Sequence, residues 1–264
     1  MKTIIASSIA VLVLVCAPVQ AQWAKVPPAK LPQTPDGKPD LSAPPPRLPN
    51  GKPDLSGIWR PENTYDGKPA NFAANLQVDN IPYQPWAQAL LEERKTGIHE
   101  NEDSSALCLP QGVPRMDAAP GQWKVVQTSP DFIVILYEAF GILWRQIFLD
   151  GREVAEDAPS SWLGYSTGKW DGDTLVVDTK GFNGKFWLDQ QGKPITEALH
   201  VIERFRRKDF GHMDVEITID DPKAYTKPWT FMEHVRLLTD MELMEAICNE
   251  NNRDLEHLPG GNLR

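Results

Sequence analysis

The sequence predicts a mainly β protein in which antiparallel strands follow one another as a meander and curl into a barrel or a strongly curved sheet. Residues 162–178 contain two alternating runs joined by Asp171-Gly172, and an Asp-Gly pair between such runs is a strong hairpin signal. Further alternating runs separated by turn residues extend to residue 248, with almost no helical pattern between them. Such a series is typical of closed or strongly bent antiparallel sheets.

The expected strands follow the chain in order, with turns such as Asp150-Gly151 and Phe210-Gly211 between them. A mature chain of this length can bury one sizeable core, so we expect residues 56–264 to form a single β-barrel domain. About nine strands are expected, at residues 123–128, 131–138 and 141–150, in both halves of 162–178, and at 199–207, 213–220, 229–238 and 242–248.

One helix is expected within the domain, over residues 83–97. Pro85 lies in its first turn, Leu90 and Leu91 give it an apolar face, and Gly97 can end it. The following residues, 98–122, have the pattern of a long loop, and residues 249–258 that of a short C-terminal helix.

The first 21 residues have the pattern of a secretory signal peptide. Lys2 supplies the positive charge, residues 4–16 are apolar, and residues 19–21 (Val-Gln-Ala) form a small-x-small cleavage site. A lipid anchor at Cys16 is the alternative, which the bulky preceding Val15 disfavours. Since no other segment reaches 18 uninterrupted apolar residues, we expect a periplasmic or secreted protein whose mature chain does not insert into a membrane.

Residues 22–55 are expected to form a proline-rich N-terminal arm. It contains an internal repeat, Pro-Asp-Gly-Lys-Pro-Asp-Leu-Ser at 35–42 and Pro-Asn-Gly-Lys-Pro-Asp-Leu-Ser at 49–56. Two short copies are too few for a solenoid. Because proline stiffens the chain and removes backbone donors, the segment is expected to be an extended arm on the domain or a tether, with recognition by a partner as the alternative.

The charge of the chain excludes two classes of function. The formal net charge is −9, and removal of Lys2 with the signal peptide changes it to −10. An acidic chain without a basic patch is a poor partner for nucleic acid or for an anionic membrane surface.

Cys108 and Cys248 are the two cysteines that follow the expected signal peptide. Two thiols in an exported protein most often pair, and this bridge would stabilise the fold by about 4–5 kcal/mol in the chain-entropy treatment. A redox pair or a metal thiolate site is the alternative, but the C-x-x-C spacing is missing.

Several runs give the chain a resemblance to known proteins. Residues 51–59 (GKPDLSGIW), 164–178 (GYSTGKWDGDTLVVD), 203–207 (ERFRR) and 220–225 (DDPKAY) resemble a large family of exported bacterial proteins of unassigned function. Gly57-Ile58-Trp59 also resembles the opening G-x-W of calycins, the lipocalin-like barrels, at a place where a first strand could begin. That resemblance implies a barrel that holds a small apolar ligand, whereas the helix and loop at 83–122 depart from the calycin pattern.

Strand alternation singles out three charged residues. Every second side chain of a strand lies on one face, and Glu203, Glu233 and Arg145 each interrupt an otherwise apolar face. Because an unpaired buried ion costs several kcal/mol, these residues should meet one another or a ligand. They are therefore either a structural ion pair or a binding or catalytic site, with a Glu for proton transfer and Arg145 to orient an oxygen.

Other residues are weaker candidates. Tyr137 shares a face with Ile133 and Ile135, which favours core packing over proton donation. His200, on the face opposite Glu203, is more typical of a rim position than of a catalytic one. As ligand-binding residues we expect the loop pair Trp187 and Asp189, which could equally anchor the loop, together with inward-facing aromatic residues: Phe205, Phe231 and Trp229.

Motifs for metals and cofactors are missing from the sequence. No H-x-H, H-x-x-x-H or H-E-x-x-H occurs, nor a P-loop or dinucleotide fingerprint, so no metal and no cofactor is expected. The first hypothesis is a barrel that binds a small apolar or aromatic molecule. A cofactor-independent lyase, dehydratase or isomerase and an envelope interaction protein are the alternatives, and the oligomeric state stays open.

Overall fold

The computed structural model describes residues 31–62, 64–65, 68–69, 71–119, 121–138, 143–154, 158–248 and 250. Its main feature is a closed barrel in the order β1-β11-β10-β9-β8-β7-β6-β5-β4. The strands are β1 (Gly57–Pro61), β4 (Trp123–Ser129), β5 (Phe132–Tyr137), β6 (Leu143–Phe148), β7 (Tyr165–Asp171), β8 (Thr174–Lys180), β9 (His200–Arg207), β10 (His212–Asp220) and β11 (Trp229–Leu238). The expected mainly β, barrel-forming fold is confirmed.

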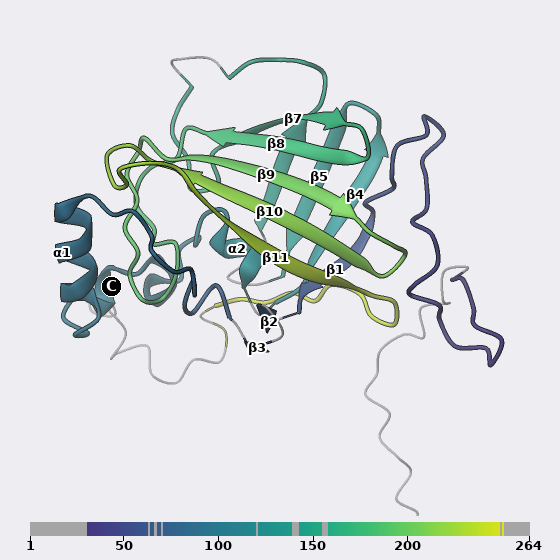
Figure 1. The fold of residues 1–264 in the computed structure, drawn as a ribbon, viewed down its shortest axis with the longest axis horizontal. Coiled ribbons are helices and arrows are strands. Elements are labelled where there is room, and N and C mark those ends of the chain that lie inside the picture. Colours follow the sequence, from purple (N-terminus) through teal and green to yellow (C-terminus); the bar gives the residue numbers. More distant parts are fainter. Residues whose placement is uncertain are drawn as a thin grey trace, which may run out of the picture.

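The remaining elements lie outside this barrel wall. The strands β2 (Thr64–Tyr65) and β3 (Lys68–Pro69) form a separate pair, and the helices are α1 (Pro85–Arg94), η1 (Glu100–Glu102), η2 (Ser104–Leu107) and α2 (Arg115–Ala118). Figure 1 shows β7 to β11 crossing in front of β4 to β6 at a steep angle, with α1 outside one end of the barrel. The segment expected to be one long loop, 98–122, thus contains three short helical turns.

Consecutive strands pair as antiparallel hairpins, as the meander predicts, except that β6 and β7 pair in parallel through two residues. In the β7–β8 hairpin Asp171 pairs with Thr174, so the turn is Gly172-Asp173, one residue later than expected. Gly172 has a φ of +60°. A positive φ at the first central residue of a two-residue turn is what a type II′ hairpin requires.

The barrel closes where β1 pairs with both β4 and β11. Trp59 lies opposite Trp123 at this seam, and both rings are buried. The expectation that a strand begins at Gly57 is confirmed. The expected strand at 242–248 is wrong: β1 occupies the edge of β11 that this segment would need, so the closed barrel has no free edge to pair with it.

The expected helix at 83–97 is confirmed in its centre as α1, with Pro85 as its first residue and Leu91 buried. The helix ends at Arg94, and Gly97 follows with a φ of +83°. Within the described residues no helix is both long and apolar enough to cross a membrane. The expected signal peptide at 1–21, Cys16 within it, and the expected helix at 249–258 lie outside the described residues, apart from Glu250.

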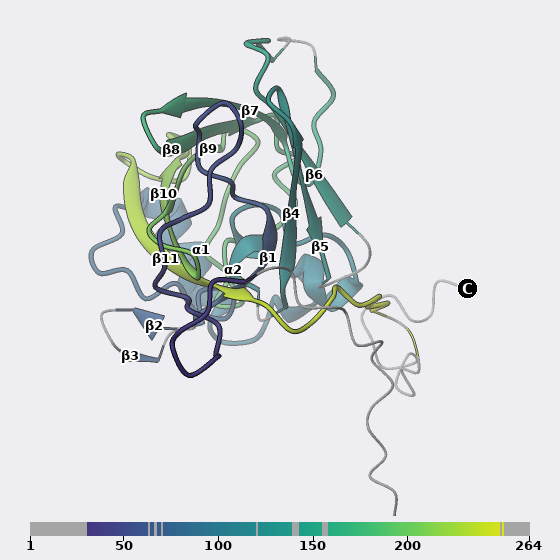
Figure 2. The ribbon, with the colours of Figure 1, turned by 90° about the vertical axis from the view of Figure 1, so that its right-hand side faces the viewer.

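The duplicated arm sequence folds into duplicated turns. Pro39 bridges to Gln33 and Pro53 bridges to Arg47, and each copy carries its glycine at a φ of +81°. The second copy is held at the barrel end formed by the β7–β8 and β9–β10 turns, where Arg47 pairs with Asp173 at 2.7 Å. Figure 2 shows the arm crossing this end. The opposite end is covered by α2 and the segment around α1.

Candidate functional site

Arg145 is at the centre of a polar cluster inside the barrel. It lies on the inward face of β6 and is almost completely buried. Its Nε donates to Ser166 at 2.9 Å, its Nη2 donates to Thr179 at 2.8 Å, and its two terminal nitrogens grip both carboxylate oxygens of Glu203, with Nη1 at 3.0 Å from Oε1. This two-pronged pair is the strongest geometry available to a guanidinium and a carboxylate.

Register explains why these groups meet. Glu203 on β9 lies opposite Val177, whose neighbour on the same face of β8 is Thr179, and Thr179 lies opposite Ser166 on β7. Arg145 reaches these groups from β6, the next strand of the barrel wall. Side chains from three neighbouring strands therefore converge on the one guanidinium that β6 carries. The structure brings Arg145 and Glu203 together, as alternation suggested.

Asp117 is a member of the cluster that the sequence reading missed. It lies on α2, where all four residues are buried at the barrel end. Tyr137 donates its hydroxyl proton to Asp117 Oδ1 at 2.6 Å, and Oδ2 lies 3.6 Å from Arg145 Nη1. Pro114 directly before α2 is a helix-start signal that could have marked the segment.

The environment of Asp117 favours its protonated form. Burial, followed by the nearby Glu203 carboxylate, raises the pKa of Asp117 to about 7, while Arg145 and the Tyr137 hydroxyl act in the opposite direction. A carboxyl with a pKa near 7 can either accept or donate a proton at neutral pH. Tyr137 is buried on the face predicted for it, and its hydroxyl is held by this bond.

Glu233 differs from the other buried charges. It lies on the inward face of β11 with 2% of its surface exposed, and neither carboxylate oxygen has a hydrogen-bond partner among the described residues. Its neighbours on that face are Phe231 and Val235, and Val215 lies opposite on β10. Burial, then the charges of Asp117 and Glu203, raise its pKa well above the usual value, so the neutral acid is favoured.

The inward-facing aromatic candidates lie on the same strands. Phe205 is buried on β9, and Phe231 and Trp229 are buried on β11 with ring centroids 5.9 Å apart. Phe72 packs edge-on against Phe231 at 5.3 Å. The indole nitrogen of Trp229 has no partner among the described residues. These rings form an apolar surface beside Glu233.

Three other candidates are not part of the cluster. His200 lies on the outer face of β9, with Nε2 2.9 Å from Asp178. Trp187 packs under the Arg94 guanidinium at 4.4 Å. Asp189 accepts the backbone N–H of Leu76 at 2.7 Å. Trp187 and Asp189 are buried and fix their loop to the segment outside the barrel.

The predicted disulfide is confirmed, with the Cα atoms of Cys108 and Cys248 5.6 Å apart. It ties the segment that leads into α2 to the chain after β11. Among the described residues, no group of three or more His, Cys, Asp or Glu side chains is arranged to hold a metal ion.

Comparison with known proteins adds little to this site. No family model and no curated protein matches the chain, so the resemblance to an exported bacterial family stays a prediction. A solved structure of a mutant of the fluorescent protein UnaG is similar over 70% of this chain and 96% of its own, with 12% identity and a TM-score of 0.32. The closed barrel is established by the strand pairings of this chain itself.

Proposed function

We propose that the protein binds a small, mostly apolar or aromatic molecule inside the barrel, and that Glu233 recognises a hydroxyl or carbonyl group of that molecule. The observation that supports the proposal is the pair of unpartnered carboxylate oxygens of a fully buried Glu233. A buried polar group without a partner destabilises a fold by about 1–3 kcal/mol. A protein tolerates this cost more readily when a bound ligand supplies the missing hydrogen-bond partner.

The chemistry of Glu233 indicates what it would bind. In its neutral form the carboxyl offers one O–H donor and one free acceptor oxygen. Arg145 already holds Glu203, so an anionic ligand has no free guanidinium there. A neutral hydroxyl or carbonyl group therefore suits the site better than a carboxylate or a phosphate.

The surroundings of Glu233 supply the apolar part of the site. Trp229, Phe231 and Glu233 follow one another on the inward face of β11. Two unpartnered polar groups, the Trp229 indole N–H and the Glu233 carboxyl, thus flank a phenyl ring over a distance of about 13 Å along the strand. This arrangement favours an elongated aromatic molecule.

Entry to the interior requires movement of a covering segment, because Glu233 is 2% exposed. Phe72, from the segment before α1, packs on the inward-facing Phe231, and α2 places Asp117 against Tyr137. These two segments cover the cluster at one end of the barrel. We infer that a ligand enters when one of them is displaced.

The test compares two probes that differ in one hydroxyl group. The wild type should bind 2-naphthol about tenfold more tightly than naphthalene, as expected for one additional buried hydrogen bond. Glu233→Gln should keep the preference because an amide still forms that bond, whereas Glu233→Leu should abolish it. Glu216→Gln, on the outer face of β10, is the matched control.

Titration followed by tryptophan fluorescence measures both affinities. Equal affinity of the wild type for the two probes, or an unchanged preference in Glu233→Leu, would contradict the proposal. Native mass spectrometry of protein released from its own envelope then identifies a retained molecule.

A second candidate function is a cofactor-independent lyase, dehydratase or isomerase in the same interior. The pKa of about 7 at Asp117, beside the Tyr137 hydroxyl, favours it. In that case Asp117→Asn should abolish turnover while ligand affinity stays close to that of the wild type. An unchanged rate in this variant removes Asp117 as the acid or base.

We further propose that the protein is exported to the periplasm or secreted. Residues 1–21 support this through their signal-peptide pattern, and a disulfide is typical of oxidising compartments. The division into a signal peptide (1–21), an arm (22–55) and a barrel domain (56–264) belongs to the same proposal. Residue-resolved proteolysis of exported protein tests both boundaries.

A further inference from the structure

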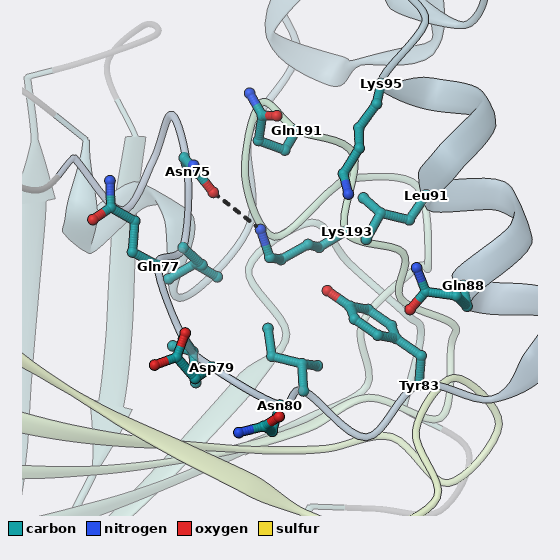
Figure 3. A pocket seen from close by; sticks show the side chains of 13 residues that line it. Asn75, Gln77, Asp79, Asn80, Tyr83, Gln88, Leu91, Lys95, Gln191 and Lys193 are labelled. Carbon is teal, nitrogen blue, oxygen red and sulfur yellow. Dashed lines mark hydrogen bonds between the residues drawn. The ribbon is translucent and has the colours of Figure 1, made fainter.

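An open cavity lies outside the barrel, between α1, residues 75–83 and the loop at 191–193. Its volume is about 640 Å³, within the range of small-molecule sites. Five side-chain amides line it: Asn75, Gln77, Asn80, Gln88 and Gln191. Figure 3 shows these amides around the Tyr83 ring and Lys193.

The floor of this cavity is held firmly by one buried carboxylate. Asp189 accepts the Leu76 N–H at 2.7 Å and the Lys193 ammonium at 2.6 Å, and it is fully buried. Gln190 N–H donates to the Ala73 carbonyl at 2.9 Å beside it. The two walls at 73–76 and 189–193 are therefore fixed to each other without any ligand.

The charges of the cavity argue against an anionic ligand. Lys193 pairs with Asp189 at 2.6 Å and also donates to Asn75 at 3.3 Å. Lys95 pairs with Glu92 at 2.9 Å. Both lysines that line the cavity thus have a carboxylate partner, and Asp79 adds a negative charge at its rim. A phosphate or carboxylate would meet no unpaired cation among these residues.

The amides instead suit a ligand with many hydroxyl groups. Gln77, Asn80 and Gln191 are exposed, and their side chains make no hydrogen bond to the described residues. Each amide offers both donors and an acceptor, which is also the pattern of a hydroxyl group. Tyr83 adds a half-buried ring and hydroxyl that face the same space (Figure 3), and such a ring can pack on the C–H face of a sugar.

We propose that this amide-lined cavity binds a neutral polyhydroxylated molecule of the size of a monosaccharide or disaccharide. The proposal is independent of the barrel interior, because none of the residues that line the cavity belongs to the Arg145 cluster. It gives the protein a second, polar binding site at the end of the barrel opposite the arm.

The test uses the full mature chain and four probes: maltose, N-acetylglucosamine, glucuronate and inorganic phosphate. At least one of the two neutral sugars should bind more tightly than glucuronate and phosphate, as measured by calorimetry or by NMR shifts of the side-chain amides. The double variant Gln77→Ala/Gln191→Ala should weaken that sugar about tenfold or more, since it removes at least one ligand hydrogen bond. Gln146→Ala, exposed on the outer face of β6, is the matched control and should bind like the wild type.

Three results would overturn the proposal: no binding of either neutral sugar, tighter binding of phosphate or glucuronate, or unchanged sugar affinity in the double variant. Each variant is first checked for an unchanged melting temperature. Should the double variant lose stability, Gln77→Ala alone serves in its place, because its exposed side chain has no hydrogen-bonding partner in the described fold.

Discussion

The Arg145 side and the Glu233 side of the barrel start from the same sequence signal, a single charge on an otherwise apolar strand face. On one side Arg145 meets Glu203, Ser166 and Thr179, so the guanidinium and the carboxylate satisfy each other. On the other side Glu233 meets only apolar neighbours on its own and the adjacent strand. The same sequence pattern can therefore indicate either a structural network whose hydrogen bonds are satisfied or a buried polar group that lacks a partner.

The difference has a consequence for charge. A paired carboxylate stays ionised because its partner replaces the lost water, whereas an unpaired one becomes a neutral acid. The Arg145 side should thus dominate the stability of the barrel, and the Glu233 side should dominate its dependence on pH. Asp117 stands between the two, close to Arg145 and bonded to Tyr137.

The largest effect is expected from Arg145→Met. It leaves the Glu203 carboxylate buried without a cation, and breaking one partner of a buried pair costs about 3–5 kcal/mol. Urea unfolding at neutral pH measures the loss. The double variant Arg145→Met/Glu203→Met removes both charges and should recover most of the stability. A loss below about 1 kcal/mol in the single variant would show that the pair is not a structural centre.

The next effect is expected from Glu233→Gln, and it has the opposite sign. Because the pKa of Glu233 is raised in the folded state, the folded protein keeps a proton that the unfolded chain releases above its usual pKa. Wild-type stability contributed by this group is therefore present at low pH and falls as pH rises. Glutamine does not titrate, so the variant should match the wild type near pH 4 and exceed its stability by a margin that grows as the pH rises to 8.

Unfolding curves at several pH values measure this divergence. The outer-face variant Glu216→Gln should keep the wild-type pH profile. A Glu233→Gln profile parallel to the wild type would mean that Glu233 is not a neutral acid in the folded protein.

The barrel fold could be predicted from the sequence because strand alternation and turn residues are local signals. The hairpin at 162–178 and the strand at 229–238 appear as β7, β8 and β11 with small boundary shifts. Residues 242–248 were also expected to form a strand, yet they form none. Whether a strand edge is free depends on how the sheet closes, and β1 closes it from a distant part of the chain. No local pattern carries that information.

For the candidate site, the sequence predicted which strand side chains face inward but not which contacts they make. Arg145, Glu203, Glu233 and Tyr137 were found because alternation fixes the face on which a strand side chain lies. Asp117 was missed because a one-turn helix in a loop reaches the interior only through the tertiary fold. The local sequence also does not determine which buried charges form a pair. It does not indicate that Arg145 pairs with Glu203 while Glu233 has no partner among the described residues.

A smaller effect is expected from Asp117→Asn. The pKa of Asp117 is about 7 in the fold and lower in the unfolded chain, so its contribution to stability declines between about pH 4 and pH 7. The amide removes this titration and can still accept the Tyr137 proton through its oxygen. We expect a flatter pH profile in that window and a higher stability than the wild type at pH 8. Calorimetric melting temperatures at pH 4, 6 and 8 would reveal it, and an unchanged slope would contradict it.

The smallest effect is expected from His234→Ala, next to Glu233 in the chain but on the outer face of β11. His234 Nδ1 lies 2.6 Å from Asp214, and both side chains are partly exposed. Water and salt screen such a pair, so its loss should cost less than about 1 kcal/mol, and less still at high salt. Urea unfolding of His234→Ala and of Glu233→Gln compares the stability contributions of the outer and the inner face of the same strand. If the unfolding free energy changes as much in His234→Ala as in Glu233→Gln, the difference in burial between the two faces of β11 does not determine the size of the effect.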